Sequence, residues 1–251
     1  MKRGVKKEMK VNPLLVFSNV YDCEPVINAL HKINADILCV NYYKYPYNWL
    51  IGDKYFKEHP EYTHYIPIAP DLVPNPDEFE IMRKYVQEFD FDVYGPCCNV
   101  DMEREKDYLA TCLKLPELEY NKRHYKWLAE SQRQFLLSKN VTILDVKFNA
   151  LCAPFIKRKI KLDIPFTKLP YPTTEKPIWE TEFKSGYASD LAFCHFCNYR
   201  QVPIKQDLRF KWLHLRYNGE LQIGKKEPNV FLLKNNEYTP IEIDLREYVT
   251  Q

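Results

Sequence analysis

Two short apolar runs with a helical pattern between them begin the chain, and they constrain its fold more than any other feature. Residues 12–20 (NPLLVFSNV) follow this pattern of a buried strand, and residues 35–43 (ADILCVNYY) are again short, apolar and partly β-branched. Residues 24–33 (EPVINALHKI) repeat apolar side chains at helical spacing, and Pro25 suits the first turn of a helix. A strand, a helix and a strand within about thirty residues predict a parallel βαβ unit with a right-handed crossover.

Apolar runs and turn signals continue this alternation along the chain. Asn75 and Pro76 resemble an N-cap and a first-turn residue, and acids follow them where the helix dipole favours negative charge. Asn235 and Asn236 mark the turn of a C-terminal hairpin. The further elements predicted, in chain order, are a loop with a short helix over 44–62, a strand over 63–69, a helix after Asn75 with Phe79, Met82, Val86 and Phe89 on one apolar face, a strand over 90–96 ended by Gly95 and Pro96, a helix over 118–138, a strand over 141–148, a loop with a short helix over 149–160, an extended segment over 168–183, a helix capped by Ser189, a strand over 202–217 and the hairpin over 229–245.

These patterns predict one α/β domain with a short C-terminal addition. The chain has 251 residues, of which 45% are hydrophobic, which is enough to bury a sizeable core. We expect a basic, flexible N-terminus over 1–10, the main domain over 11–217 and an extension containing the β-hairpin over 218–251.

Charge and cysteine content narrow the classes of partner and compartment. A net charge of +2 gives no support to a nucleic-acid partner. The chain shows neither a run of eighteen apolar residues nor an apolar signal-peptide core, so we expect no transmembrane segment and a cytoplasmic protein, with a membrane-peripheral location as an alternative. The 8 cysteines are then expected to be mostly reduced, although one disulfide remains an open alternative.

Polar residues stand where the predicted strands end or a helix begins. Asn41, Asp71 and His214 come at or near strand ends, and Asp190 opens a helix. Ligands of open α/β sheets bind beyond the carboxyl ends of the strands, so these residues are candidates for a binding site. Taken singly, each is also explained as a turn or first-turn residue.

The order of these segments resembles the GT-A fold of nucleotide-sugar glycosyltransferases, and it is most similar to the inverting family-two type. The resemblance runs over about residues 12–217, from the βαβ unit through YIPIAPDLVPNPDEFE and SDLAFCHFC to WLHL. That family carries an Asp-x-Asp motif after a strand, where this chain has Ala69, Pro70 and Asp71. It therefore implies a single GT-A-like domain with a mixed, mostly parallel sheet flanked by helices. Residues 11–100 would then form the nucleotide-sugar-binding half and 101–217 the acceptor-binding half.

The resemblance also implies a role for each candidate residue. A nucleotide-diphosphate sugar would be the donor, and a glycan, protein or lipid hydroxyl the acceptor. Asp71 and His214 would hold a divalent cation, Mn²⁺ or Mg²⁺, against the diphosphate, and Asp190 would be the general base. The full set of residues implied to contact the nucleotide is Ser18, Asn19, Val20, Asn41, Pro70 and Asp71, and the candidates for acceptor or phosphate contacts are Arg158 and Trp212.

Other interpretations stay open at this level. The replacement of the first acidic residue by Ala69 also fits a catalytically degenerate protein that binds nucleotide or glycan, and a purely structural α/β protein is a third class. Cys194, His195 and Cys197 raise the question of zinc, but a structural zinc site needs a second ligand pair, and Cys97 and Cys98 are adjacent in sequence. The oligomeric state is open, with a homodimer as one alternative.

Overall fold

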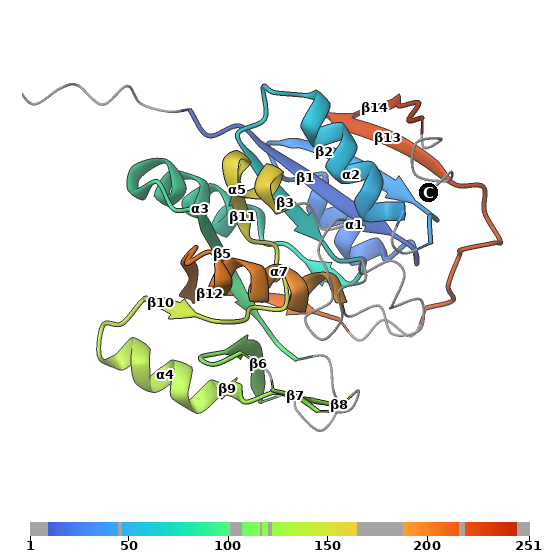
Figure 1. Ribbon diagram of the computed structural model, residues 1–251. Coiled ribbons are helices and arrows are strands. Elements are labelled where there is room, and N and C mark those ends of the chain that lie inside the picture. Colours follow the sequence, from blue (N-terminus) through green and yellow to red (C-terminus); the bar gives the residue numbers. More distant parts are fainter. Residues whose placement is uncertain are drawn as a thin grey trace, which may run out of the picture.

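A ten-stranded mixed sheet with helices on both faces forms the protein (Figure 1). The computed structural model describes residues 10–44, 47–100, 107–115, 117–119, 122–164, 188–215 and 219–244. The strands of this sheet are β1 (Pro13–Asn19), β2 (Asp36–Asn41), β3 (His64–Ile68), β4 (Leu72–Val73), β5 (Val93–Cys98), β10 (Ile143–Val146), β11 (Phe155–Lys157), β12 (Ile204–His214), β13 (Asn229–Lys234) and β14 (Glu237–Pro240).

The strand order is β10-β12-β5-β11-β3-β1-β2-β13-β14, and β4 pairs with the end of β12. The strands β1, β2, β3, β5 and β12 share one direction, whereas β11 lies antiparallel between β3 and β5. This is the mixed, mostly parallel sheet that the sequence predicts, and it is consistent with a single GT-A-like domain. The predicted C-terminal hairpin is also present, and β13 extends the sheet beside β2.

Alternate side chains of the central strand pack into different cores. Leu14 and Val16 of β1 face one core, and Leu15 and Phe17 face the other. Both faces of the strand are therefore covered, which explains why residues 12–20 read as a continuous apolar run rather than an alternating one. The first core is covered by α2 (Tyr47–Glu58), α5 (Arg158–Asp163) and α7 (Ala188–Tyr199), and the second by α1 (Glu24–Leu30) and α3 (Pro76–Phe89).

The residues predicted to start the first and third helices are confirmed. Pro25 lies in the first turn of α1, and the Asn75 side chain accepts hydrogen bonds from the backbone amides of Asp77 and Glu78 at the start of α3. The expectation for Phe89 is wrong, because its side chain is 51% exposed at the end of α3 and stacks on Tyr85 and Phe91 at the surface.

The helix predicted over 118–138 is wrong in its first half. Those residues begin with β7 (Glu117–Glu119), β8 (Lys122–His124) and β9 (Trp127–Ala129), and only α4 (Glu130–Ser138) is helical. The strand β9 pairs with β6 (Tyr108–Cys112), and the helix starts where the Gln132 side chain accepts the backbone N–H of Ala129. These small sheets and α4 lie to one side of the main sheet, at the bottom of Figure 1.

Two strands also differ from the sequence expectation. The strand β5 continues through Gly95 and Pro96 to Cys98, because β12 pairs with it over this whole length. A Cβ at position 95 would lie only 2.8 Å from Pro154, which explains why this strand residue is a glycine. The loop expected over 149–160 contains β11, a strand made of residues that pair on both sides. Residues 1–9 and the extended segment expected over 168–183 lie outside the described residues, as do residues 216–218 and the side chain of Ser189.

His64, at the start of β3, makes folding depend on pH. Its side chain is 1% exposed, and burial lowers the pKa of the imidazole to about 4, with the charge of Lys157 adding to this. Between pH 6.5 and 4 the unfolded chain therefore binds a proton that the folded chain does not, so stability falls as pH falls through this window. We expect the wild type to lose about 3 kcal/mol of unfolding free energy from this residue between these pH values. Urea unfolding at pH 7 and pH 4.5 should show a smaller loss for His64→Phe, and an equal loss in both proteins would contradict the assignment.

Candidate functional site

Asp71 and His214 meet at the edge of the sheet where β3 ends. Asp71 follows β3 and precedes β4, and His214 is the last residue of β12, where it pairs with Leu72 of β4. The Nε2 atom of His214 lies 3.3 Å from Oδ1 of Asp71, and the two side chains are 23% and 18% exposed. The strand pairing thus brings two residues that the sequence singled out into direct contact at a partly open surface.

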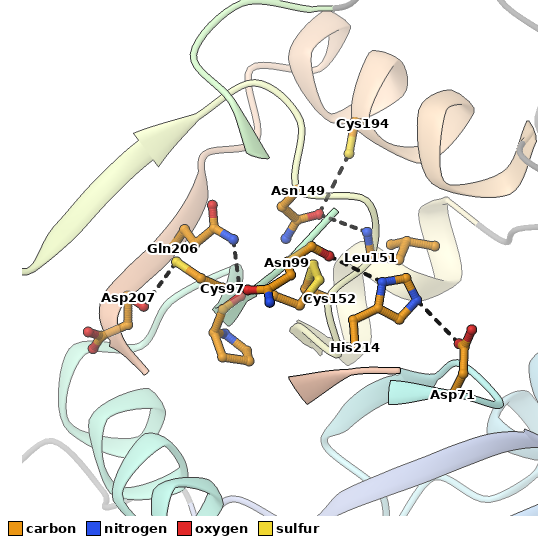
Figure 2. Close-up of a disulfide and its surroundings, with 12 residues drawn as sticks. Asp71, Cys97, Asn99, Asn149, Leu151, Cys152, Cys194, Gln206, Asp207 and His214 are labelled. Atoms are coloured by element: carbon orange, nitrogen blue, oxygen red, sulfur yellow. Dashed lines mark hydrogen bonds and ion pairs between the residues drawn. A yellow bond between two sulfur atoms is a disulfide. The ribbon is translucent and has the colours of Figure 1, made fainter. Parts of the chain in front are cut away.

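The other ring nitrogen of His214 is held by the chain. Nδ1 lies 3.2 Å from the backbone carbonyl oxygen of Asn99, which can only accept a hydrogen bond, so Nδ1 carries the proton. With Nδ1 protonated, Nε2 either carries a second proton, which makes its contact with Asp71 an ion pair, or presents the lone pair through which it can ligate a metal ion. Figure 2 shows His214 between Asn99 and Asp71.

The spacing of this pair also suits a shared cation. Two neighbouring ligands at about 2.1 Å from one octahedral ion lie about 3.0 Å apart. The observed separation of 3.3 Å between Nε2 and Oδ1 is close to this value. A carboxylate and an imidazole form a donor set that Mn²⁺ accepts, with other positions left to phosphate oxygens and water. Among the described residues no group of three or more His, Cys, Asp and Glu side chains is placed to hold a metal ion.

A disulfide and a strained loop lie behind the pair (Figure 2). Cys98, the residue before Asn99, is bonded to Cys152. Ala150, Leu151 and Ala153 around it all have positive φ, a conformation that is costly outside glycine and that is concentrated at functional sites. The buried Oδ1 of Asn149 accepts from the Leu151 amide and faces Cys194 of α7 at 3.8 Å. The loop therefore connects the backbone that holds His214 to the helix that carries Asp190.

Asp190 lies in the first turn of α7 and is partly buried. Its Oδ1 accepts a hydrogen bond of 2.7 Å from the backbone amide of Leu191. Burial raises the pKa of the Cys194 thiol well above its usual range, and the charge of Asp190 one turn away adds to this. The Asp190 carboxylate therefore caps a backbone amide at the start of α7.

The predicted nucleotide residues Asn19 and Asn41 are joined in a chain of amides. Asn19 Nδ2 donates to Oδ1 of Asn41 at 3.0 Å, and Asn41 Nδ2 donates to Oδ1 of Asn229, at the start of β13, at 2.8 Å. All three line one open cavity of about 360 Å³. Beside them, Asp22 accepts from Tyr42 and forms an ion pair with Lys226.

Four other predicted contact residues have different surroundings. Ser18 is buried against Asn48 on α2, and Val20 offers its carbonyl to the backbone amide of Gln222. Pro70 forms the turn before Asp71 and is partly exposed. Trp212 is 1% exposed in the core, so its ring cannot present a face to an acceptor.

Arg158 is not brought to this site. The strand pairing places its neighbour Lys157 opposite His64, at the start of β3, whereas Asp71 follows the end of that strand. Its guanidinium donates to carbonyl oxygens of the last turn of α2 and of the segment after it, namely those of Phe56, Lys57, His59 and Tyr62. Arg158 therefore binds backbone carbonyl groups at the end of α2 and is not placed for the acceptor or phosphate contact that the resemblance implies.

Sequence reasoning missed Asn99, Asn149, Asn229 and Lys226. Asn99 was hidden because β5 was expected to end at Pro96, and Asn149 because a buried amide in a loop has no periodic signal. The pairing of β13 with β2 connects residues 188 positions apart at Asn41 and Asn229, which no local pattern reveals. Asp22 also lines this region, and an Asp shortly after a strand is the sequence signal for it, because Asp tolerates the positive φ observed there.

The comparisons with known proteins supply structural neighbours but no sequence relatives. No family model matches the chain, and no curated protein matches it. Among the solved structures that match is the crystal structure of A197 from STIV, at a TM-score of 0.45 and 14% sequence identity, covering 93% of this chain and 96% of that chain. Within the described residues, no helix combines the length and the apolar character needed to cross a membrane.

Proposed function

We propose that the protein is an inverting, metal-assisted glycosyltransferase that uses a nucleotide-diphosphate sugar. The observation that carries this proposal is the contact between Asp71 and His214, 3.3 Å apart beyond the end of β3 and on the same sheet edge as Asn19 and Asn41. The resemblance drawn from the sequence implies the same two residues as ligands of a diphosphate-bound cation.

Each side chain has a defined part in the proposed reaction. Asp71 and His214 would hold Mn²⁺ or Mg²⁺, which neutralises charge on the diphosphate leaving group. Asp190 would accept the proton of an acceptor hydroxyl as its oxygen bonds to the anomeric carbon and the bond from that carbon to the diphosphate oxygen breaks. One displacement of this kind inverts the anomeric configuration. The acceptor, whether glycan, protein or lipid, and a homodimeric state stay predictions from the sequence.

One residue favours a second candidate function. Ala69 stands where the resembling family has the first acid of its motif, and it packs against the apolar core. A protein with this change that binds nucleotide or glycan without turnover would keep nucleotide binding and show no release of nucleotide from any sugar donor.

Thermal unfolding with UDP or GDP, in the presence and absence of Mn²⁺, tests the metal pair. A ligand at about 100 times its Kd stabilises by about 2.7 kcal/mol, which for a chain of this size corresponds to a rise in Tm of roughly 5–10 °C. We expect Mn²⁺ to increase the nucleotide-induced rise in the wild type, and Asp71→Asn and His214→Ala to remove that increase.

Asp77→Asn is the matched control. Asp77 is an exposed carboxylate six positions along the chain, in the first turn of α3. It should respond to Mn²⁺ as the wild type does. If Asp71→Asn and His214→Ala keep the full metal response, the pair is only a histidine–carboxylate contact that closes β4 onto β12, and the proposal loses its support.

A further inference from the structure

The C-terminal segment, residues 219–244, forms one wall of the open cavity beside β2. This segment follows the part of the sequence, about residues 12–217, that resembles the GT-A fold. The cavity is bounded by α1, the ends of β1 and β2, and the hairpin of β13 and β14. Its walls are apolar, and the side chains that form them are Phe17, Ile27, Leu30, Cys39, Phe231 and Leu233. A volume of about 360 Å³ with apolar walls is in the range of small-molecule sites.

The rim of this cavity is made of polar side chains that are hydrogen-bonded to one another. The amides of Asn19, Asn41 and Asn229 bond to one another, and each amide has both donor and acceptor atoms. Asp22 and Tyr42 both have positive φ, 58° and 62°, and the Tyr42 hydroxyl donates to Asp22 at 2.7 Å. A bulky residue held in this conformation is costly, and such residues are concentrated at ligand sites.

A lysine from the C-terminal segment stands at the same rim. Lys226 forms an ion pair with Asp22, and its ammonium lies 5.2 Å from the centre of the Tyr42 ring. The Lys226 side chain is 48% exposed, and an ion pair this exposed contributes little stability, so an anionic ligand can replace Asp22 at low cost.

The rim lies close to Asp71. The strand order puts β1 between β2 and β3, so the ends of β2 and β3 are two strand spacings, or about 10 Å, apart. Cys23 follows Asp22, and burial raises the pKa of its thiol, with the charge of Asp71 raising it further. The apolar cavity, its polar rim with Lys226 and the Asp71–His214 pair therefore lie one after another along the carboxyl ends of β2, β1 and β3.

We propose that this cavity binds the nucleoside of a nucleoside diphosphate, with Asn229 at the base or ribose edge and Lys226 moving from Asp22 to the diphosphate. The inference rests on the proposed function, which places the diphosphate at Asp71 and His214. It adds that Lys226 and Asn229, which follow the part of the chain that resembles the GT-A fold, belong to the donor site and contribute to donor affinity.

Calorimetric titration of UDP, GDP, uridine and guanosine tests the assignment. Ile27→Trp fills the cavity from a half-buried position on α1 and should weaken binding of nucleoside and nucleotide by at least about 30-fold. Asn229→Ala shortens a rim side chain without filling the cavity and should weaken both about tenfold. Lys226→Met should weaken the diphosphates about tenfold and leave the nucleosides unchanged.

Lys225→Met is the matched control, because Lys225 is the neighbouring lysine with the same exposed fraction of 48% and pairs with Glu220 instead. It should bind every ligand within about twofold of the wild type, as expected for an exposed charge away from the ligand.

If the wild type binds UDP or GDP through Asp71 while Ile27→Trp, Asn229→Ala and Lys226→Met bind equally well, the cavity assignment is overturned and the proposed function stands. If the cavity variants lose binding but Asp71→Asn does not, the cavity is the site and the metal pair is wrong. A wild type that binds none of the four ligands would overturn both.

Discussion

Replacing Asp190 by alanine is expected to lower sugar transfer by about 10²–10⁴-fold, the usual contribution of a general base. The expected loss is in turnover, because the carboxylate would act on the acceptor hydroxyl and not on the donor. Nucleotide binding and its dependence on Mn²⁺ should therefore stay as in the wild type. The measurement is the release of UDP or GDP from a panel of sugar nucleotides with Mn²⁺ present, with nucleotide affinity determined on the same preparations.

Asp190→Asn separates this role from a structural one. Asparagine keeps an oxygen that can accept the 2.7 Å hydrogen bond from the Leu191 amide, but it cannot take up a proton at neutral pH. If Asp190 only stabilises the start of α7, the asparagine variant should be active and the alanine variant should lose at most about 1 kcal/mol of stability. If Asp190 is the base, both variants should be inactive. Asp163→Ala, which removes an exposed carboxylate at the end of α5, is the control.

The parts of the fold that could be predicted are those with local signals. The first βαβ unit is predictable because its strands are buried on both faces and its helix has a proline in the first turn. The start of α3 at Asn75 and the turn at Asn235 and Asn236 were readable because these residue types satisfy a specific backbone conformation or amide. In each case the physical cause lies within a few residues of the signal.

The parts that could not be predicted depend on distant pairing. The strand β11 is only three residues long, and it is a strand because β3 and β5 offer it hydrogen-bonding edges on both sides. The segment before α4 has an aromatic, charged pattern that resembles a helix, yet Trp127 and Leu128 pair with β6. Neither partner can be identified from the residues of the segment itself.

The same distinction applies to the candidate site. Asp71 and His214 could be singled out because each follows a strand, and their contact then came from the pairing of β4 with β12. Arg158 and Trp212 were chosen from residue type and position in the chain, and the tertiary structure directs one to the end of α2 and the other into the core. The contribution of Asn229 and Lys226 depends on where the hairpin docks, which has no local cause.

Removal of Asp207 is expected to be among the most destabilising single changes in the protein. This carboxylate in β12 is fully buried, accepts the hydroxyl of Tyr94 at 2.6 Å and is held by both the backbone and the guanidinium of Arg209. The Arg209 guanidinium is held in turn by the hydroxyl of Tyr85 at 2.8 Å. Asp207→Ala leaves a buried phenol and a partly buried cation without their common partner, and we expect a loss of about 3–5 kcal/mol in the free energy of unfolding.

An exposed ion pair on the neighbouring strand supplies the comparison. Asp145 in β10 pairs with Lys205, but its side chain is 69% exposed, so Asp145→Ala should cost no more than about 1 kcal/mol. Denaturant unfolding of the two variants against the wild type measures both values, and a similar small loss in each would show that the buried carboxylate does not hold the sheet together.

Asp207→Ala is also expected to affect the candidate site, because the register of β12 decides where His214 lies. A bulge lies between Asp207 and Lys211, and after it Lys211 and Trp212 pair with Cys97 and Cys98 of β5. Across it β12 advances four residues while β5 advances one, so the later residues of β12 are shifted by three positions relative to β5, which decides which of them lies beside Asn99. The Asp207–Arg209 contacts fix the backbone at the start of this bulge. Asp207→Ala protein that is still folded at low temperature should therefore also lose part of the Mn²⁺-dependent rise in Tm with UDP or GDP, whereas Asp145→Ala should keep all of it.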